Sequence, residues 1–312
     1  MPTETRAGLR EALRAMGATL SAGRLASNPL APIQRPHGSS SMLEHDRIEA
    51  IPVVPMAPPA TVGFLDGIQR YSHEANLGLV PVFLAQVSAL VKVRADGRLE
   101  LGPKKEKRFL VVPLARLDSQ QCAQLQALKT EVHDSKAEAA PHPLVDRQRA
   151  VEEIERVREQ VELAAGMDFL ADHQQSLLIA DGAIGDFGGN ERVVGVIKSH
   201  ETQYLSGADL EVALTLPYRC RSSVFERTSA RGQKVHTWYL RLWPWDGEDI
   251  FYGLVRVERS AGRKNVAEAD ELSGWLLAER TPLSSPDGRW DRLLYPIHAV
   301  EETLRAQAGS WA

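Results

Sequence analysis

Cysteine is scarce in this chain, with only Cys122 and Cys220 among 312 residues. The two lie far apart and form no CxxC pair, which argues against a disulfide framework and against a cysteine-based zinc site. Free thiols at this low density are typical of a reducing compartment, so we expect a cytoplasmic protein.

The chain also lacks a long hydrophobic run. The most apolar stretch, Leu77 to Val91, contains Pro81, Gln86 and Ser88 and is shorter than the roughly 20 residues that span a bilayer. The amino terminus has no basic-then-apolar signal pattern. The sequence therefore predicts neither export nor a membrane anchor, and it favours a buried strand over this stretch.

A large excess of either charge is missing too, since the formal net charge is −4. This value argues against a broadly cationic coat for nucleic acid, although a local groove can still bind phosphate. Hydrophobic residues make up 43% and charged residues 25%, as in ordinary soluble globular proteins. The chain is long enough for one elaborated domain with appendages.

Residues 3 to 22 have the spacing of an amphipathic helix, and a Pro-, Ser- and Gly-rich stretch follows through Ser41. We therefore predict an N-terminal helical arm and linker over residues 1–50. The main domain is predicted over residues 51–312.

Within the main domain, two predicted strands each run directly into Asp-Gly. Residues 61 to 65 lead into Asp66-Gly67, and residues 176 to 180 lead into Asp181-Gly182, so both aspartates are expected at strand ends. Alternation and helical periodicity predict further strands at 79–93, 99–101, 193–197, 236–243 and 251–258, and helices at 147–170, 267–279 and 295–307. This mixture predicts an α/β fold with a mixed sheet flanked by helices.

Asp66 and Asp181 are the first candidates for chemistry. Two carboxylates at one sheet edge can share a hard divalent cation, and two such cations can clamp the attacking and leaving oxygens of a phosphodiester. The alternative is that Asp-Gly is a common turn dipeptide, as it is expected to be at Asp96-Gly97 and Asp246-Gly247.

The predicted helix 147–170 offers a third carboxylate. Glu152, Glu155, Glu159 and Glu162 recur at three- and four-residue spacings and share one side of the helix. A solvated helix face, with arginines pairing to these glutamates, explains the same pattern. Glu162 and Glu155 are the two candidates for a metal ligand.

Lys198 follows the apolar run 193–197 at once, so its ammonium group is expected near Asp181, where it can neutralise phosphate charge. A lysine that merely ends a strand is the plain alternative. Phosphate neutralisation dominates nucleic-acid affinity, and the candidate nucleic-acid contacts are Lys104, Lys105, Arg219, Arg221 and Arg241.

Several motifs occur in one order. Asp66-Gly67 follows a strand, a Glu-bearing helix comes next, and then Leu-Leu-Ile-Ala-Asp181-Gly182. Downstream come Val-Val-Gly-Val-Ile-Lys198-Ser, Thr-Trp-Tyr-Leu-Arg241-Leu, Phe-Tyr-Gly-Leu-Val-Arg256-Val-Glu258 and Leu-Tyr295-Pro-Ile. In this order, over residues 60 to 307, the chain resembles the NurA nucleases.

The resemblance implies an RNase H-like fold and a homodimer around DNA. It also implies dependence on Mn²⁺ or Mg²⁺, and degradation of DNA by 5′-to-3′ exonuclease and endonuclease action. The expected partner is a HerA-like hexameric DNA-translocating ATPase, with which such nucleases act in DNA end processing, repair or phage defence.

Carried over by residue, Asp66 and Asp181 match the metal aspartates, and Glu162, with Glu155 in reserve, matches the helix glutamate. The family commonly has a histidine one or two helical turns beyond Tyr-Pro, where this chain has Glu301, Glu302 and Thr303. His298 lies closer to Tyr295-Pro296 and is the candidate replacement. The departure leaves open a catalytically degenerate DNA-binding or adaptor subunit. A metal-dependent phosphatase or RNA-directed RNase H-like enzyme also remains open, because carboxylates do not identify the sugar.

Overall fold

The computed structural model describes residues 5–20, 40–136, 142–200, 202–228, 232–246, 248–262, 264–280 and 290–308. The strands are β1 (Thr19–Leu20), β2 (Ser40–Met42), β3 (Ala50–Pro52), β4 (Thr61–Leu77), β5 (Val80–Ala95), β6 (Arg98–Val112), β7 (Glu131–Asp134), β8 (Leu177–Asp181), β9 (Val193–Ile197), β10 (Cys220–Ser222), β11 (Phe225–Thr228), β12 (Lys234–Arg241) and β13 (Leu254–Ser260). The α-helices are α1 (Arg6–Ala15), α2 (Ser119–Gln126), α3 (Pro143–Asp172), α4 (Gly207–Leu214), α5 (Asn265–Ala278) and α6 (Tyr295–Gln307).

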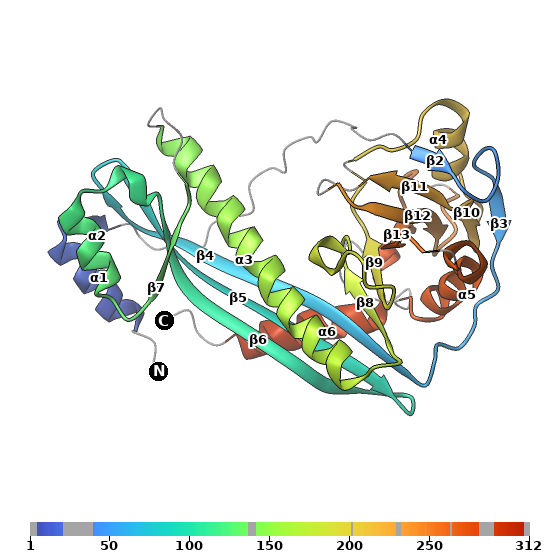
Figure 1. Ribbon diagram of the computed structural model, residues 1–312, viewed down its shortest axis with the longest axis horizontal. Coiled ribbons are helices and arrows are strands. Elements are labelled where there is room, and N and C mark those ends of the chain that lie inside the picture. Colours follow the sequence, from blue (N-terminus) through green and yellow to red (C-terminus); the bar gives the residue numbers. More distant parts are fainter. Residues whose placement is uncertain are drawn as a thin grey trace.

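One mixed sheet carries the fold, in the strand order β2-β11-β12-β13-β9-β8-β4-β5-β6-β7. Strands β4, β8 and β9 are mutually parallel, and β6 pairs with β7 in parallel. The other pairs in this order are antiparallel, including the long β4–β5–β6 meander that extends away from the rest of the sheet (Figure 1). The expected mixed α/β sheet flanked by helices is confirmed.

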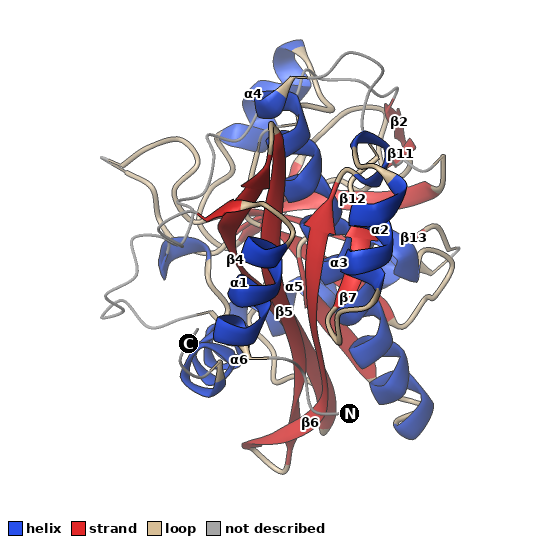
Figure 2. Cartoon of the chain, turned by 90° about the vertical axis from the view of Figure 1, so that its left-hand side faces the viewer, coloured by secondary structure: helices blue, strands red, loops and turns tan. Residues whose placement is uncertain are grey.

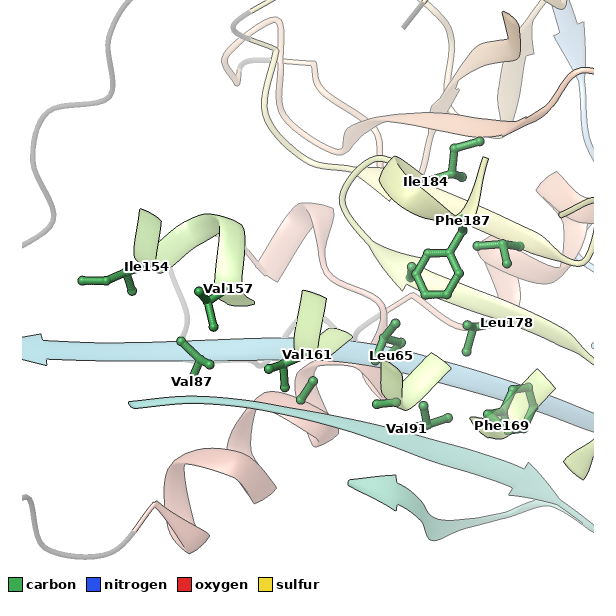
Figure 3. Close-up of a cluster of buried hydrophobic side chains, with 14 of the residues drawn as sticks. Leu65, Val87, Val91, Ile154, Val157, Val161, Phe169, Leu178, Ile184 and Phe187 are labelled. Carbon is green, nitrogen blue, oxygen red and sulfur yellow. The ribbon is translucent and has the colours of Figure 1, made fainter. Parts of the chain in front are cut away.

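Helix α3 covers one face of the long strands. Its buried residues Ile154, Val157, Val161 and Phe169 pack against side chains of β4, β5 and β8 (Figure 3). Apolar residues of α5 and α6, including Leu276 and Ile297, pack in a second cluster on the opposite face. The prediction of a helix over 147–170 is confirmed, and α3 starts four residues earlier because Pro143 suits the first helical turn.

Helices α1 and α2 lie together at the far end of the meander (Figures 1 and 2). Leu9 and Leu13 of α1 are fully buried against β4, β5 and β6 residues such as Leu77 and Leu84. Thr5 caps α1 by accepting a hydrogen bond from the Gly8 amide. The apolar stripe of the predicted amino-terminal helix is therefore covered by this chain's own sheet. Most of the predicted linker lies outside the described residues.

The structure corrects the expected end of the strand that precedes Asp66. β4 continues through Asp66 as far as Leu77 because the antiparallel partner β5 runs beside it over its whole length. What ends near Asp66 is the parallel pairing with β8, whose last matched pair is Leu65 and Ala180. Among the described helices, none has the length and apolarity to cross a membrane.

Candidate active site

Asp66 and Asp181 lie side by side on neighbouring strands. Since Leu65 is matched with Ala180 in the parallel β4–β8 pair, the next residue of each strand is an aspartate. Asp66 is only 9% exposed. Burial raises the pKa of Asp66 well above its usual range, and the charges of Asp181 and Glu162 raise it further. The predicted pairing of the two aspartates is present.

Lys198 approaches the same point from β9. Asp181 is matched with Val196, and Lys198 follows the last residue of β9. Its Nζ lies 2.8 Å from Asp181 Oδ1. The positive charge of Lys198 lowers the pKa of Asp66 and so opposes the larger effects of burial and of Asp181. The expected juxtaposition of Lys198 and Asp181 is confirmed.

Glu162 reaches the centre from α3, above Gly67. A Cβ atom at position 67 would overlap the Glu162 carboxyl group, so a larger residue there would displace this side chain from its position beside Asp66. Arg158, one turn earlier on α3, forms an ion pair with Glu162. Burial nevertheless raises the pKa of Glu162 to about 7, because the opposing effect of Arg158 is smaller and Asp181 adds repulsion.

Glu155, the reserve candidate, lies elsewhere along α3. Burial and the charge of Glu155 together raise the pKa of Tyr71, which places Glu155 near Tyr71 rather than Asp66. Tyr71 is five residues beyond Asp66 on β4, roughly 16 Å at the rise of an extended strand. The structure therefore brings Glu162, and not Glu155, to the two aspartates.

The donor set has the chemistry of a divalent-metal site, since carboxylate oxygens are the ligands of Mg²⁺ and Mn²⁺. Within the described ranges, however, no three His, Cys, Asp or Glu side chains are arranged so that they could hold a metal ion. Lys198 pairs with Asp181, Arg158 pairs with Glu162, and the Gly67 amide donates to Asp66 Oδ1 at 2.7 Å. The residues fit a metal by type, and binding one requires these internal partners to be exchanged.

His298 lies in the first turn of α6, the helix that packs against β4 and β5. Its ring Nδ1 is buried and has no hydrogen-bond partner. In the part of the chain that the structure describes, no hydrogen bond or ion pair joins His298 to the carboxylates. Its proposed role at the centre stays a prediction.

Two of the predicted nucleic-acid contacts prove to be buried. Arg221 is 1% exposed and pairs with Glu44 and Asp270. Arg241 is fully buried and donates to backbone carbonyls, including those of Leu216 and Ile250. Burial lowers the pKa of Arg241 to about 10. In this structure neither guanidinium is free to meet a nucleic-acid backbone, so the prediction that Arg221 and Arg241 contact nucleic acid is corrected. The alternation of side chains along a β-strand does not by itself tell which face of the sheet an arginine lies on.

The other basic candidates remain at the surface. Lys104 and Lys105 lie on β6, where they form ion pairs with Glu106 and Asp168 at 3.4 and 2.5 Å. Arg219 is exposed, and its guanidinium lies 5.0 Å from the ring centre of Tyr218. These three side chains keep their status as predicted contacts.

A cavity of about 450 Å³ opens beside the carboxylates. Glu162 and Asp181 line one part of its wall, and Arg227, Arg256 and Glu258 line another. Arg256 and Glu258 belong to one of the sequence motifs, but neither had a predicted role. Their i and i+2 spacing on a strand was the available signal, because such residues share a face.

Comparison with known proteins bears on the architecture. No family model and no curated protein matches the sequence. Among solved structures, the crystal structure of the NurA nuclease from Sulfolobus solfataricus matches with a TM-score of 0.50 and 10% identity, covering 82% of each chain. The chain has the NurA fold. The expected likeness to NurA is confirmed as a likeness of fold, and at this identity the chemistry has to come from the site.

Proposed function

We propose that this chain is a divalent-metal-dependent deoxyribonuclease of the NurA type. The observation that carries the proposal is the pairing of Asp66 and Asp181 on adjacent parallel strands, with Glu162 packed over Gly67 beside them. Three carboxylates that repel one another in a buried place favour binding of a cation. The NurA fold supports the assignment to nucleic-acid hydrolysis.

The chain's own residues divide the work. Asp66, Asp181 and Glu162 would supply oxygen ligands for Mn²⁺ or Mg²⁺. When bound, the cation supplies charge neutralisation at the phosphate and activation of water. Lys198, 2.8 Å from Asp181, is placed to transfer its hydrogen bond to a phosphate oxygen. His298, which lies on α6, is the candidate residue for proton transfer during the reaction.

The likeness to NurA also motivates finer proposals. We infer 5′-to-3′ exonuclease and endonuclease action, a homodimer around DNA, and work with a HerA-like DNA-translocating ATPase in DNA end processing, repair or phage defence. We further infer that residues 1–41 dock the ATPase. Charge reversal at the exposed α1 residues Glu11 and Arg14 should weaken co-purification with the ATPase and spare cleavage, whereas deletion would also remove the buried Leu9 and Leu13 from the core. Sedimentation at micromolar concentration tests the dimer.

A second candidate is a catalytically degenerate DNA-binding subunit of such an ATPase complex. Two observations favour it. The cationic side chains of Arg158 and Lys198 already pair with Glu162 and Asp181, and no described contact links His298 to the carboxylates. Under this alternative the protein binds DNA and never cuts it.

Cleavage of labelled single- and double-stranded DNA in Mn²⁺, Mg²⁺ or EDTA tests the proposal. Asp66→Asn and Asp181→Asn keep the side-chain shape and remove the charge, so cleavage should fall by about a thousandfold or more while DNA affinity changes little. Asp96→Asn is the matched control, since Asp96 is an exposed Asp-Gly turn residue with φ 48°, which asparagine tolerates.

Two results decide between the candidates. Equal cutting by wild type and Asp66→Asn rejects the proposed centre. Binding without cutting by the wild type, in every metal, selects the DNA-binding subunit instead. An RNA–DNA hybrid and a phosphate monoester in the same panel test the RNase H-like and phosphatase alternatives.

A further inference from the structure

Two arginines share one buried glutamate in the cavity beside the carboxylates. Arg227 Nε donates to Glu258 Oε1 at 2.9 Å, and Arg256 Nη1 donates to the same oxygen at 2.5 Å. Glu258 is fully buried, and each arginine is 5% exposed. Two guanidinium groups and one carboxylate leave one net positive charge in a largely desolvated place.

An aromatic ring fixes the two guanidinium groups further. Each lies 4.6 Å from the ring centre of Tyr204, a distance at which a cation is attracted to a ring. Arg256 uses only Nη1 in its described hydrogen bond, although a guanidinium has five N–H donors. Donors are therefore left over on a side chain that lines the cavity.

Glu258 has unused capacity as well. Its second oxygen, Oε2, is buried and has no hydrogen-bond partner, and Glu258 lines the same cavity. A buried acceptor without a partner costs free energy, which a donor group of a ligand would recover. The cluster thus offers donors to an anion and one acceptor to a hydroxyl or amino group beside it.

The cluster lies close to the carboxylate centre in the sheet. Asp181 on β8 is matched with Val196 of β9, and the next residue of β9, Ile197, is matched with Arg256 of β13. Two strand spacings correspond to roughly 10 Å, which is about three nucleotide rises along one stacked strand. A nucleic-acid strand held at Asp181 would therefore bring a phosphate about three nucleotides along the strand to Arg256.

We propose that Arg227 and Arg256, held by Glu258 and Tyr204, bind a phosphate of the nucleic-acid strand about three nucleotides from the one being cut. This inference rests on the proposed function and names a subsite of the same cavity. The arginines bind the phosphate oxygens, and Glu258 Oε2 accepts a hydrogen bond from a hydroxyl or amino group of the same nucleotide.

The test measures binding apart from cleavage. Fluorescence anisotropy with a short single-stranded DNA, in EDTA, compares the wild type with Arg256→Gln and Arg227→Gln. Loss of a charge-assisted contact should weaken binding about 10- to 100-fold. The slope of log affinity against log salt should flatten by about 0.7 for one phosphate. Arg149→Gln is the control, since Arg149 lies half-exposed on α3 in an ion pair with Glu152 outside the cavity.

A charge-balanced variant separates a loss of binding from a loss of folding. Arg256→Gln leaves Glu258 with one partner fewer, whereas Arg256→Gln combined with Glu258→Gln removes one charge of each sign. The double variant should melt closer to the wild type and still bind weakly. Arg256→Lys keeps the charge but loses the planar donor fork, so its affinity should lie between those of wild type and Arg256→Gln.

Two oligonucleotides distinguish the source of the phosphate. A loss seen only with a 5′-phosphorylated strand assigns the subsite to a terminal monoester, and a loss with 5′-hydroxyl strands as well assigns it to an internal diester. Folded variants that bind like the wild type overturn the subsite, whether or not the wild type cuts. Weaker binding by the arginine variants, with no cleavage by the wild type, keeps the subsite and rejects the nuclease.

Discussion

Asp66 and Glu74 lie on the same strand, β4, and both are buried, yet their surroundings differ. Glu74 receives Arg6 and Arg10 at 2.9 and 2.8 Å and a hydrogen bond from Ser72. Burial raises the pKa of Glu74, but the bonds from Ser72, Arg6 and Arg10 outweigh it, and the pKa is lowered. For Asp66 burial dominates, Asp181 adds to it, and the pKa is raised.

The difference separates a charge that the chain itself satisfies from the charge that we propose binds a cation. Glu74 is fully satisfied within the chain, and its ion pairs fasten α1 to the sheet. Asp66 retains unfavourable free energy in its charged form, which a bound cation would relieve. Burial alone therefore does not indicate a site, whereas burial without sufficient compensation does.

The largest expected effect concerns pH. In EDTA the pKa of Glu162 rises from its ordinary 4.5 to about 7 on folding, a gap worth on the order of 3 kcal/mol. The folded state then holds more protons between these values, so this contribution to stability is present below pH 4.5 and is lost as pH rises to about 7. Denaturant unfolding from pH 4.5 to 8 should show a larger loss in wild type than in Glu162→Gln, which still carries the raised pKa of Asp66. If the unfolding free energies of wild type and Glu162→Gln differ by the same amount at every pH, the raised pKa of Glu162 is contradicted.

Glu74→Gln should lower the free energy of unfolding by about 2 kcal/mol, because it leaves two arginines without their carboxylate. The estimate lies below the usual cost of breaking a buried pair, since Arg6 and Arg10 are 19% and 26% exposed and water can hydrate them. Urea unfolding at pH 7 measures it. Glu152→Gln, which breaks an exposed pair on α3, is the control and should cost less than about 0.5 kcal/mol.

Divalent cations should stabilise the protein through Asp66 and leave the Glu74 cluster unaffected. At ten times the dissociation constant, Mn²⁺ or Mg²⁺ should raise the unfolding free energy by about 1.4 kcal/mol. Melting curves against an EDTA reference report the shift. Asp66→Asn should abolish it and Glu74→Gln should retain it; a shift that survives in Asp66→Asn places the cation elsewhere.

The smallest expected effect is a gain in stability. In EDTA at pH 7, Asp66→Asn should stabilise the fold by about 1 kcal/mol, because it removes a buried charge repelled by Asp181 and Glu162. Asp181→Asn should stabilise less, since Lys198 then loses its partner. Thermal unfolding of both variants beside the wild type decides the sign, and destabilisation by Asp66→Asn would mean that the Gly67 amide and Lys198 already satisfy this carboxylate.

Much of the secondary structure could be predicted from periodicity. The strand over 193–197 and the helix over 295–307 match β9 and α6 in both bounds, because buried runs and helical stripes are local patterns. The hairpin strand predicted over 99–101 was too short, since β6 extends to Val112. The middle of β6, Lys104 to Arg108, is charged and lacks the alternation of apolar and polar residues that identifies a strand. Pairing with β5 keeps this segment extended.

Local sequence by itself determined that Asp66 and Asp181 each stand before a glycine after an apolar run, and that α3 carries glutamates on one side. It could not determine which glutamate meets the aspartates, because that depends on where α3 crosses β4. The same limit hid the burial of Arg221 and Arg241. Tertiary structure alone decided that Glu162 lies over Gly67 and that Arg227 of β11 joins Glu258 of β13. The physical reason is that these contacts join strands and helices far apart in sequence, so their charges interact only after the sheet has assembled.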